Sequence, residues 1–369
     1  MTKKSDIFVI ILAAGYATRL KPLSNKIPKP LIEINGKTII SRIISTFRDA
    51  GFTNFCVLKG YKGEMIEEEV KSIHEIKIEF VDQSNISGMA DAILLCINHL
   101  INKYRNINCF LISAADVLFS KEEISQCYSL YKKTKIDMIL SLMNSYDVEI
   151  AKGHGNVKVS EIPGGFVGLK ITDIIEKPAP KQILSSYYSL PFYLFNKSII
   201  PYISNVELSE RGEKEFQDAI KAAITDGRDI RGFKIINEDI TNESIGRYHL
   251  TYLEDILKMN FRFLKGNRIE DSEGNYPTLL EPVNLGRGIK IGDTVLLGPN
   301  VIFNEGCQIG DYSKIENTII FNHTILGKKI KLNHCLVDEK IQLPDNFQAQ
   351  NCFITIDENN KKEFQIINF

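Results

Sequence analysis

Phosphate chemistry is indicated by a glycine turn and two fixed cations near the amino terminus of this 369-residue chain. The apolar run over residues 7–12 is typical of a strand buried on both faces of a parallel sheet, and Gly15 follows it. Small residues at such a turn let the backbone approach a ligand, while Arg19 and Lys29 supply positive charge. Backbone N–H groups and cations together form the field that phosphate oxygens need. The stretch therefore predicts a site for a nucleotide with its phosphates.

Two carboxylates further along the chain are candidates for holding a divalent cation. Asp116 follows a buried-strand pattern at residues 109–113, and Asp218 lies in the string RGEKEFQDAI. The cysteines show no CxxC or zinc spacing and the histidines no HExxH-like grouping, so a metal site is expected to use oxygen ligands and to suit Mg²⁺. Taken separately, either aspartate has an even chance of being structural.

The stretch over residues 12–31 reads LAAGYATRLKPLSNKIPKPL and resembles the signature of the sugar-1-phosphate nucleotidyltransferases. Ala17 and Ser24 depart from that signature, because the family usually has Gly and Thr there. If the loop needs a positive φ at position 17, Ala costs it stability. The resemblance implies nucleotide binding by the first residues of the stretch, which are Leu12, Ala13, Ala14 and Gly15.

A second loop, over residues 83–92, follows another strand pattern and carries an amide side chain. A side-chain amide both donates and accepts hydrogen bonds, which matches the O and N–H edge of uracil or thymine. The spacing Gln-x4-Gly-x-Ala resembles the pyrimidine-reading loop of family members that use UTP or dTTP. Gln83 and Gly88 are therefore expected to bind the nucleoside, and the choice between UTP and dTTP stays open.

Two strings in the middle of the chain, GNVKV from Gly155 and ITDIIEKP from Ile171, resemble the sugar-phosphate segment of the same family. Their alternating apolar residues predict two antiparallel strands joined by a turn at residues 164–165. The resemblance implies that Gly155 and Glu176 bind the sugar and that Lys177 meets its phosphate.

The reaction implied by the resemblance is NTP + sugar 1-phosphate → NDP-sugar + pyrophosphate, with Mg²⁺ as cofactor. The sugar phosphate attacks the α-phosphorus in line, and no protein base is needed because a phosphate is already anionic. Arg19 is assigned to the leaving pyrophosphate, Lys29 to the α-phosphate and the incoming phosphate, and Lys177 to the sugar phosphate. Asp116 matches the aspartate that holds Mg²⁺ in the family, and Asp218 is expected as the second ligand.

Alternatives to this reaction stay open at the sequence level. Leu190 and Pro191 stand where the family usually has a small or polar residue and Gly, so the sugar is not identified and glucose 1-phosphate is in doubt. A non-catalytic regulatory or assembly subunit of the same architecture is one other class. The complete set of cations and carboxylates argues against it. A bifunctional enzyme with acyltransferase activity in its carboxyl-terminal region is the other.

Alternating strand and helix patterns over residues 32–130 predict βαβ units and an α/β, Rossmann-like domain with a mostly parallel sheet. Ligands in such sheets lie beyond the carboxyl ends of the strands, so Gly15, Gln83 and Asp116 are expected to converge. A helix near residues 247–260 is expected to close the catalytic domain, residues 1–265. There His249 replaces an Asp of the family pattern and is interpreted as a core residue.

From residue 283 the apolar pattern repeats every sixth residue. The recurring positions are Leu285, Ile291, Leu297, Phe303, Ile309, Ile315 and Phe321. This hexapeptide signature predicts a parallel β-helix in residues 266–369, left-handed by the resemblance, with two to three coils and a terminal hairpin near residues 353–367. So short a stack favours a scaffold or a homo-oligomer interface over acyl transfer.

The overall composition is that of an ordinary globular protein, with 44% hydrophobic and 25% charged residues. A formal net charge of −1 gives no global basic field to attract nucleic acid or an anionic membrane surface. No apolar run reaches the ~20 residues that span a bilayer. Seven cysteines, an odd number, indicate free thiols and a reducing cytoplasm.

Overall fold

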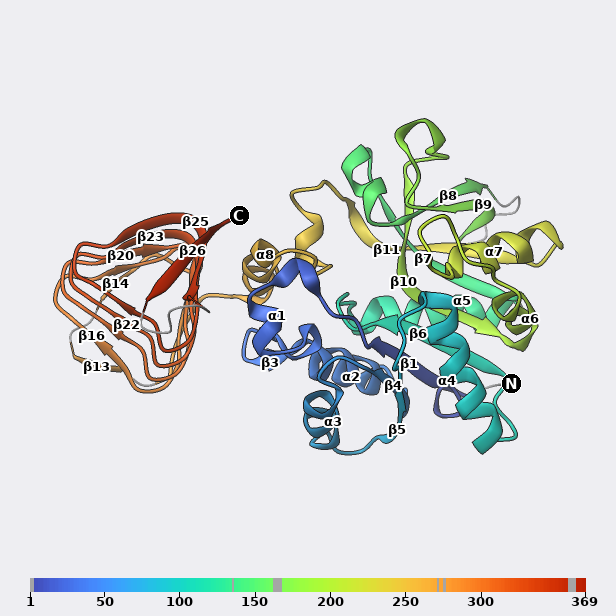
Figure 1. Cartoon of the computed structure of the whole chain (residues 1–369), viewed down its shortest axis with the longest axis horizontal. Helices are drawn as coiled ribbons and strands as arrows, with labels where there is room; N and C mark the ends of the chain where they lie inside the picture. Colours follow the sequence, from blue (N-terminus) through green and yellow to red (C-terminus); the bar gives the residue numbers. More distant parts are fainter. Residues whose placement is uncertain (1–2, 135, 162–167, 271, 275–276, 358–362) are drawn as a thin grey trace. The chain divides into compact units, whose positions relative to one another are not determined.

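The computed structural model describes residues 3–134, 136–161, 168–270, 272–274, 277–357 and 363–369. The chain divides into two compact units, Met1–His249 and Leu250–Phe369 (Figure 1). Helix α8 (Leu253–Phe263) belongs by its contacts to the second unit. The sequence predicts that the catalytic domain ends at residue 265, which lies beyond this helix. That domain boundary stays a prediction, because the division by contacts does not test where the catalytic function ends.

A nine-stranded mixed sheet forms the centre of the first unit within the described residues, in the order β5-β4-β1-β6-β10-β7-β11-β9-β8. Its strands are β1 (Phe8–Ala13), β4 (Asn54–Lys59), β5 (Lys77–Asp82), β6 (Cys109–Ala114), β7 (Met138–Asn144), β8 (Gly155–Ser160), β9 (Leu169–Glu176), β10 (Tyr187–Asn196) and β11 (Ile230–Asp239). β5, β4, β1 and β6 run parallel, while β10 is antiparallel to β6 and β7. The expected Rossmann-like order is thus present in the first half of the sheet.

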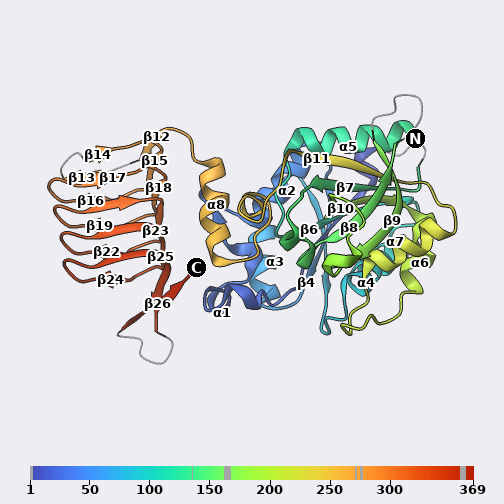
Figure 2. The same cartoon turned by 90° about the horizontal axis from the view of Figure 1, so that it is seen from above.

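Helices cover both faces of this sheet (Figure 2). The helices are α1 (Leu23–Lys26), α2 (Ile39–Asp49), α3 (Gly63–Lys71), α4 (Met89–Lys103), α5 (Lys121–Thr134), α6 (Ile200–Ser204) and α7 (Phe216–Thr225), and a short ribbon pairs β2 (Glu33–Ile34) with β3 (Lys37–Thr38). α4, α6 and α7 pack together on one face, where Ile10 and Phe110 join the main core. Because side chains alternate along a strand, Val9 and Ile11 of β1 face the other side, and both are fully buried. The continuous apolar run of β1 is explained by this burial on both faces.

The carboxyl ends of four parallel strands lie in a row at one edge of the sheet. Leu12 of β1 pairs with Leu58 of β4 and with Ala114 of β6, and β5 continues the row beside β4. The chain leaves β1 towards β4 on one side and returns to β6 on the other. Such a switch in strand order opens the crevice where α/β sheets bind ligands. Gly15, Gln83 and Asp116 were expected to converge at this edge. The strands that precede them, β1, β5 and β6, do end at the same edge of the sheet.

The middle of the chain forms the two antiparallel strands that its alternating pattern predicts. Gly155 of β8 pairs with Glu176 of β9, and the turn predicted at residues 164–165 lies outside the described residues. The neighbouring strand β10 has an irregular register between Leu190 and Tyr193. Pro191 lies within this bulge, where a residue without an N–H group is tolerated in a sheet.

The second unit is a parallel β-helix with three faces of stacked short strands (Figure 2). Its strands are β12 (Asn267–Ile269), β13 (Ser272–Gly274), β14 (Thr278–Leu279), β15 (Val283–Leu285), β16 (Ile289–Ile291), β17 (Leu296–Leu297), β18 (Val301–Phe303), β19 (Gln308–Ile309), β20 (Lys314–Glu316), β21 (Thr318–Ile320), β22 (Ile325–Leu326), β23 (Lys331–Val337), β24 (Gln342–Leu343) and β25 (Gln348–Ile356). The face β13-β16-β19-β22-β24 is five strands deep, so the expectation of only two to three coils is wrong.

The repeat continues beyond the residues predicted from the sequence. The further coils were missed because the number of residues per coil changes. The first strand pairs place partners 16 or 17 residues apart, as in Asn267 and Val283. The next coil places them 18 apart, as in Asp293 and Asp311, and later coils place them 17 apart, as in Cys335 and Cys352. Ile320, not Phe321, therefore pairs with Phe303 and is fully buried. One step of five residues in each later coil hides those coils from a strict six-residue search.

The carboxyl terminus forms the predicted hairpin. β25 pairs antiparallel with β26 (Phe364–Asn368), and residues 358–362 lie outside the described part of the chain. Helix α8 packs on β23 within the second unit, where Glu254 Oε1 lies 3.5 Å from His334 Nε2. Among the described residues, no helix combines the length and apolar character that crossing a membrane requires.

Candidate functional site

A short ion pair lies where β6 ends beside the glycine turn. Lys29 begins the single turn η3 (Lys29–Leu31) between two prolines, and its Nζ lies 2.5 Å from Oδ2 of Asp116. Burial acts to raise the pKa of Asp116, but the charges of Lys29 and His249 hold it far below its usual range. Asp116 is therefore an anion at every pH at which the protein would work.

His249 is a member of this site that the sequence analysis interpreted as a core residue. Its Nε2 lies 3.3 Å from Oδ2 of Asp116, and its Nδ1 lies 3.1 Å from Nε2 of His154. Nδ1 of His154 in turn lies 3.0 Å from the carbonyl oxygen of Ile150. Burial, with the nearby His249, lowers the pKa of His154 to about 3. The available signal was that His249 replaces an acidic residue of the family pattern.

The second oxygen of Asp116, Oδ1, is buried without a hydrogen-bond partner. A buried, unpaired carboxylate oxygen is costly, and a divalent cation is a partner that it could accept. The free oxygen and the adjacent imidazole of His249 therefore fit a cation. Within the described residues, no group of three or more His, Cys, Asp or Glu side chains is arranged to hold a metal ion by itself.

Asp218, the other expected metal ligand, is exposed on the first turn of α7. Burial, together with the charge of Glu215, raises its pKa, and Lys221 and Arg211 oppose that shift. In the part of the chain that the structure describes, no hydrogen bond or ion pair joins Asp218 to Asp116. The pairing of these two aspartates stays a prediction.

The loops after β1, β4 and β5 pack tightly against one another at the expected nucleoside end. A Cβ atom at Gly60 would lie 2.9 Å from the carbonyl oxygen of Ala14 and 3.2 Å from that of Gln83. Gly15, by contrast, is exposed, with open space where a side chain would begin. Gly60 was not anticipated, although a glycine directly after a strand pattern was a visible signal. The close packing fixes Gln83 relative to the glycine turn.

Gly88 has a structural role that the sequence did not indicate. Its φ is +117°, and a Cβ atom there would lie 2.4 Å from the backbone nitrogen of Lys214. That nitrogen donates to the carbonyl oxygen of Ser87 at 2.8 Å, and the carbonyl of Lys214 accepts from the backbone nitrogen of Ala90 at 3.0 Å. Glycine is therefore required for docking the segment that leads into α7. Contact of Gly88 with a nucleoside stays a prediction.

The expected sugar-binding residues surround a buried carboxyl group. Oε2 of Glu176 has no hydrogen-bond partner, and Oε1 lies 3.7 Å from Nζ of Lys177. Burial raises the pKa of Glu176 to about 7, although the charge of Lys177 opposes the shift. A Cβ atom at Gly155 would lie 3.1 Å from Oε2 of Glu176 and 2.8 Å from Oγ of Ser189. Glycine at position 155 therefore keeps the approach to Glu176 open.

Lys177 connects this sugar end to the aspartate end. Its backbone nitrogen donates to the carbonyl oxygen of His154 at 3.2 Å, so a continuous chain of contacts runs through the two imidazoles to Asp116. Lys177 has a φ of +45°, which is uncommon for a residue with a side chain. The structure thus links Lys29 and Lys177, two of the cations expected to contact phosphate, with Asp116, the expected metal ligand.

The loop after β1 carries the remaining predicted cation. Ala17 has φ +50° and ψ +45°, so the left-handed conformation that the signature glycine would favour is present here with alanine. Arg19 is exposed on the turn η2 (Thr18–Leu20) that follows. Its assignment to the pyrophosphate stays a prediction.

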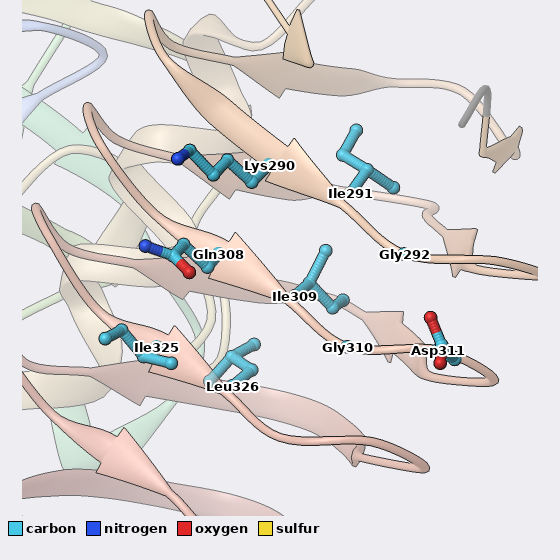
Figure 3. Close-up of a pocket in the computed structure, with 9 residues that line it drawn as sticks. All are labelled: Lys290, Ile291, Gly292, Gln308, Ile309, Gly310, Asp311, Ile325 and Leu326. Atoms are coloured by element: carbon cyan, nitrogen blue, oxygen red, sulfur yellow. The ribbon is translucent and has the colours of Figure 1, made fainter. Parts of the chain in front are cut away.

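A separate pocket of about 430 Å³ lies on the β-helix, along β16, β19 and β22 (Figure 3). Lys290, Gln308 and Ile325 form a column on its wall, because each pairs with the next across adjacent strands. Asp311 and two glycines line its other end. None of the residues predicted for phosphate or sugar binding lies in this pocket.

A glycine turn, a lysine and an aspartate with an unpaired oxygen at the carboxyl ends of parallel strands fit the site of a nucleotidyl transferase. The chain belongs to this family, since residues 8–240 match the model described as "Nucleotidyl transferase". Residues 288–322 match a second model, "Bacterial transferase hexapeptide (six repeats)".

Individual relatives agree with this assignment. The chain is similar to "Bifunctional protein GlmU" of Methanococcus maripaludis strain S2, with 27% identity over 368 residues, 93% of this chain and 77% of that protein. It is similar to "UTP--glucose-1-phosphate uridylyltransferase AglF" of Haloferax volcanii, with 29% identity over 61% of this chain and 87% of that protein. A solved UDP-glucose pyrophosphorylase complexed with UDP-glucose shares the fold, with a TM-score of 0.56 and 20% identity over 63% of this chain and 91% of that chain.

Proposed function

We propose that the chain transfers a nucleotidyl group from UTP or dTTP to a sugar 1-phosphate and releases pyrophosphate and an NDP-sugar. The observation that carries the proposal is the Lys29–Asp116 pair, with its free carboxylate oxygen, at the end of β6. A fixed cation and a carboxylate with one unpaired oxygen suit a metal-bound polyphosphate better than they suit a neutral ligand.

Catalysis in this proposal is alignment together with charge neutralisation. In this proposal Lys29 contacts the α-phosphate and the incoming sugar phosphate. Lys177 holds that sugar phosphate, and Arg19 contacts the leaving pyrophosphate. Asp116, with Asp218 as the expected second carboxylate, would hold Mg²⁺. The cation supplies charge that offsets the negative charge built up at the α-phosphorus. No protein nucleophile takes part, because the attacking phosphate oxygen is already anionic.

The substrate class rests on both ends of the crevice. Gln83 follows β5 at the nucleoside end, and the Haloferax relative bears the name of a UTP-dependent enzyme. At the other end, the unpartnered Oε2 of Glu176 can exchange hydrogen bonds with sugar hydroxyls. Leu190 is fully buried and Pro191 lies in the bulge of β10, so both departures from the family pattern have a packing explanation as well.

The test is a matrix of nucleotides and sugar 1-phosphates, read by pyrophosphate release with Mg²⁺ and, in parallel, with Mn²⁺. We expect turnover with UTP or dTTP and at least one hexose or N-acetylhexosamine 1-phosphate. Arg19→Ala should lower turnover by orders of magnitude with the fold intact, and Asp116→Asn should abolish turnover or remove its Mg²⁺ dependence. Parent rates in both variants, or no turnover with any pair, would overturn the proposal.

A second candidate function is acyl transfer in the β-helix unit. It gains support from the five-strand depth of the stack, because the argument against it rested on an expected short stack. The Methanococcus relative, named a bifunctional protein, also matches over 93% of this chain. We propose a left-handed coil, supported by the hexapeptide match and the positive φ of corner residues such as Asn300 and Asn317. Thiol release from acetyl-CoA with a sugar phosphate tests this activity; its absence removes the candidate.

The setting of the protein is part of the same proposal. All seven cysteines are buried and unpaired, which is the state expected in the reducing cytoplasm. The β-helix would serve as the interface of a homo-oligomer. Light scattering on the purified chain should then give a multiple of 41.8 kDa, and a monomer would remove this part of the proposal.

A further inference from the structure

The proton positions in the pair His154–His249 are fixed by one backbone carbonyl group. The carbonyl oxygen of Ile150 can only accept a hydrogen bond, so Nδ1 of His154 at 3.0 Å carries the proton. His154 is 8% exposed, and burial favours the neutral form of an imidazole. Nε2 of His154 is therefore left with a lone pair.

This lone pair determines the tautomer of the neighbouring ring. Nδ1 of His249, at 3.1 Å from Nε2 of His154, must be the donor of their hydrogen bond. A neutral His249 then has its own lone pair on Nε2, and this atom lies 3.3 Å from Oδ2 of Asp116. A lone pair facing a carboxylate is repulsive, so either a proton on Nε2 or a cation bound to both groups must lie between them. The same carboxylate has a buried oxygen that lacks any partner.

We propose that Nε2 of His249 and the carboxylate of Asp116 are ligands of one divalent cation, and that His154 is the positioning residue that presents this nitrogen. A mixed nitrogen and oxygen site favours Mn²⁺ or Co²⁺ over Mg²⁺, because imidazole is a poor ligand for Mg²⁺. A hydrogen bond to the other ring nitrogen is the usual means by which a protein orients a histidine ligand. The inference rests on the proposed function only in assigning this cation to nucleotidyl transfer.

Electron spin-echo spectroscopy of Mn²⁺ bound to the protein tests the ligand directly. The sample contains Mn²⁺ and UTP without a sugar phosphate, so no turnover occurs. We expect ¹⁴N modulation from a coordinated imidazole in the parent protein and in His74→Asn, a control at an exposed histidine. The modulation should vanish in His249→Asn and in His249→Asp. Absence of ¹⁴N modulation in the parent, including failure to bind Mn²⁺, would overturn the proposal, since His249 would then be a charged partner of Asp116.

Metal preference gives a second measurement that does not depend on activity. Calorimetric titration should show at least tenfold tighter binding of Mn²⁺ or Co²⁺ than of Mg²⁺ in the parent. His249→Asp should shift that ratio towards Mg²⁺ by about tenfold, the size expected for a ligand change. His154→Gln should weaken Mn²⁺ binding while leaving Mg²⁺ binding less affected. An unchanged ratio in His249→Asp contradicts the proposal. A nitrogen signal without nucleotidyl transfer would instead contradict only the proposed function.

Discussion

Nζ of Lys29 and Oδ2 of Asp116 lie 2.5 Å apart although the two residues are 87 positions apart in the chain. The turn η3 brings the lysine back over the sheet, and β6 delivers the aspartate beside β1. The side chains are 18% and 21% exposed, so water screens the pair only partly. An unligated site thus has its positive and negative charges already assembled where phosphates would bind.

Replacing Lys29 with Met should lower kcat for nucleotidyl transfer by about 10²–10³-fold, the usual effect of removing one preorganised donor to a developing charge. Lys21→Met is the matched control, because Lys21 is an exposed lysine of the same loop. Steady-state pyrophosphate release measures both variants. A loss of less than threefold in Lys29→Met would remove this lysine from the mechanism.

Gly155→Ala should raise KM for the sugar 1-phosphate at least tenfold and leave KM for the nucleotide within twofold. The added methyl group would meet Oγ of Ser189 at 2.8 Å and Oε2 of Glu176 at 3.1 Å. Gly153→Ala is the control, since a Cβ atom there meets nothing within 4 Å. Equal KM values in the two variants would show that the sugar binds elsewhere.

Glu176→Gln should change how stability depends on pH. The pKa of about 7 lies above the ordinary 4.5, so the folded protein binds more protons than the unfolded chain between those values. Wild-type stability is therefore lost as pH rises through this window, by about 3 kcal/mol at most. The Gln variant lacks this loss. Urea unfolding at pH 5 and pH 8 should show the variant gaining on the wild type at the higher pH; parallel curves would contradict the burial argument.

Ala17→Gly should be neutral or stabilising by up to about 1 kcal/mol, because the relief of a left-handed alanine exceeds the added freedom of the unfolded chain. Ala222→Gly, at an exposed position of α7, should instead cost about 1 kcal/mol. Urea unfolding measures both. If the two substitutions destabilise equally, the φ of +50° at position 17 carries no strain.

The strand ends of the first unit could be predicted because they depend on local sequence. A fully buried strand such as β1 needs a continuous apolar run, and a parallel sheet aligns the carboxyl ends of its strands. The sequence therefore indicated that Gly15, Gln83 and Asp116 share one edge. It could not indicate that Lys214 packs on Gly88, since that contact joins distant segments through backbone atoms alone.

His249 shows why the rest of the site was out of reach. Its role depends on contacts with Asp116 and His154, at sequence separations of 133 and 95 residues. The replacement of an acidic residue of the family pattern marked position 249, but it did not indicate these two partners. The prediction of the β-helix was incomplete for a different reason. Its repeat is visible in the local sequence, but the number of residues per coil changes along the chain. Where one corner of a coil is shorter by one residue, Ile320 instead of the expected Phe321 pairs with Phe303. A strict six-residue period therefore detects the coils with 18 residues per turn and misses the first strands and the later coils.

The most direct test of the central claim follows labelled UTP with the sugar 1-phosphate that gives the fastest pyrophosphate release. With [α-³²P]UTP, the account predicts that the label enters the NDP-sugar and that Asp116→Asn removes this transfer. With [γ-³²P]UTP, the label should appear in pyrophosphate and not in the sugar product. Label from the γ-phosphate on the sugar, or transfer of the α-label that persists in Asp116→Asn at the parent rate, would contradict the account.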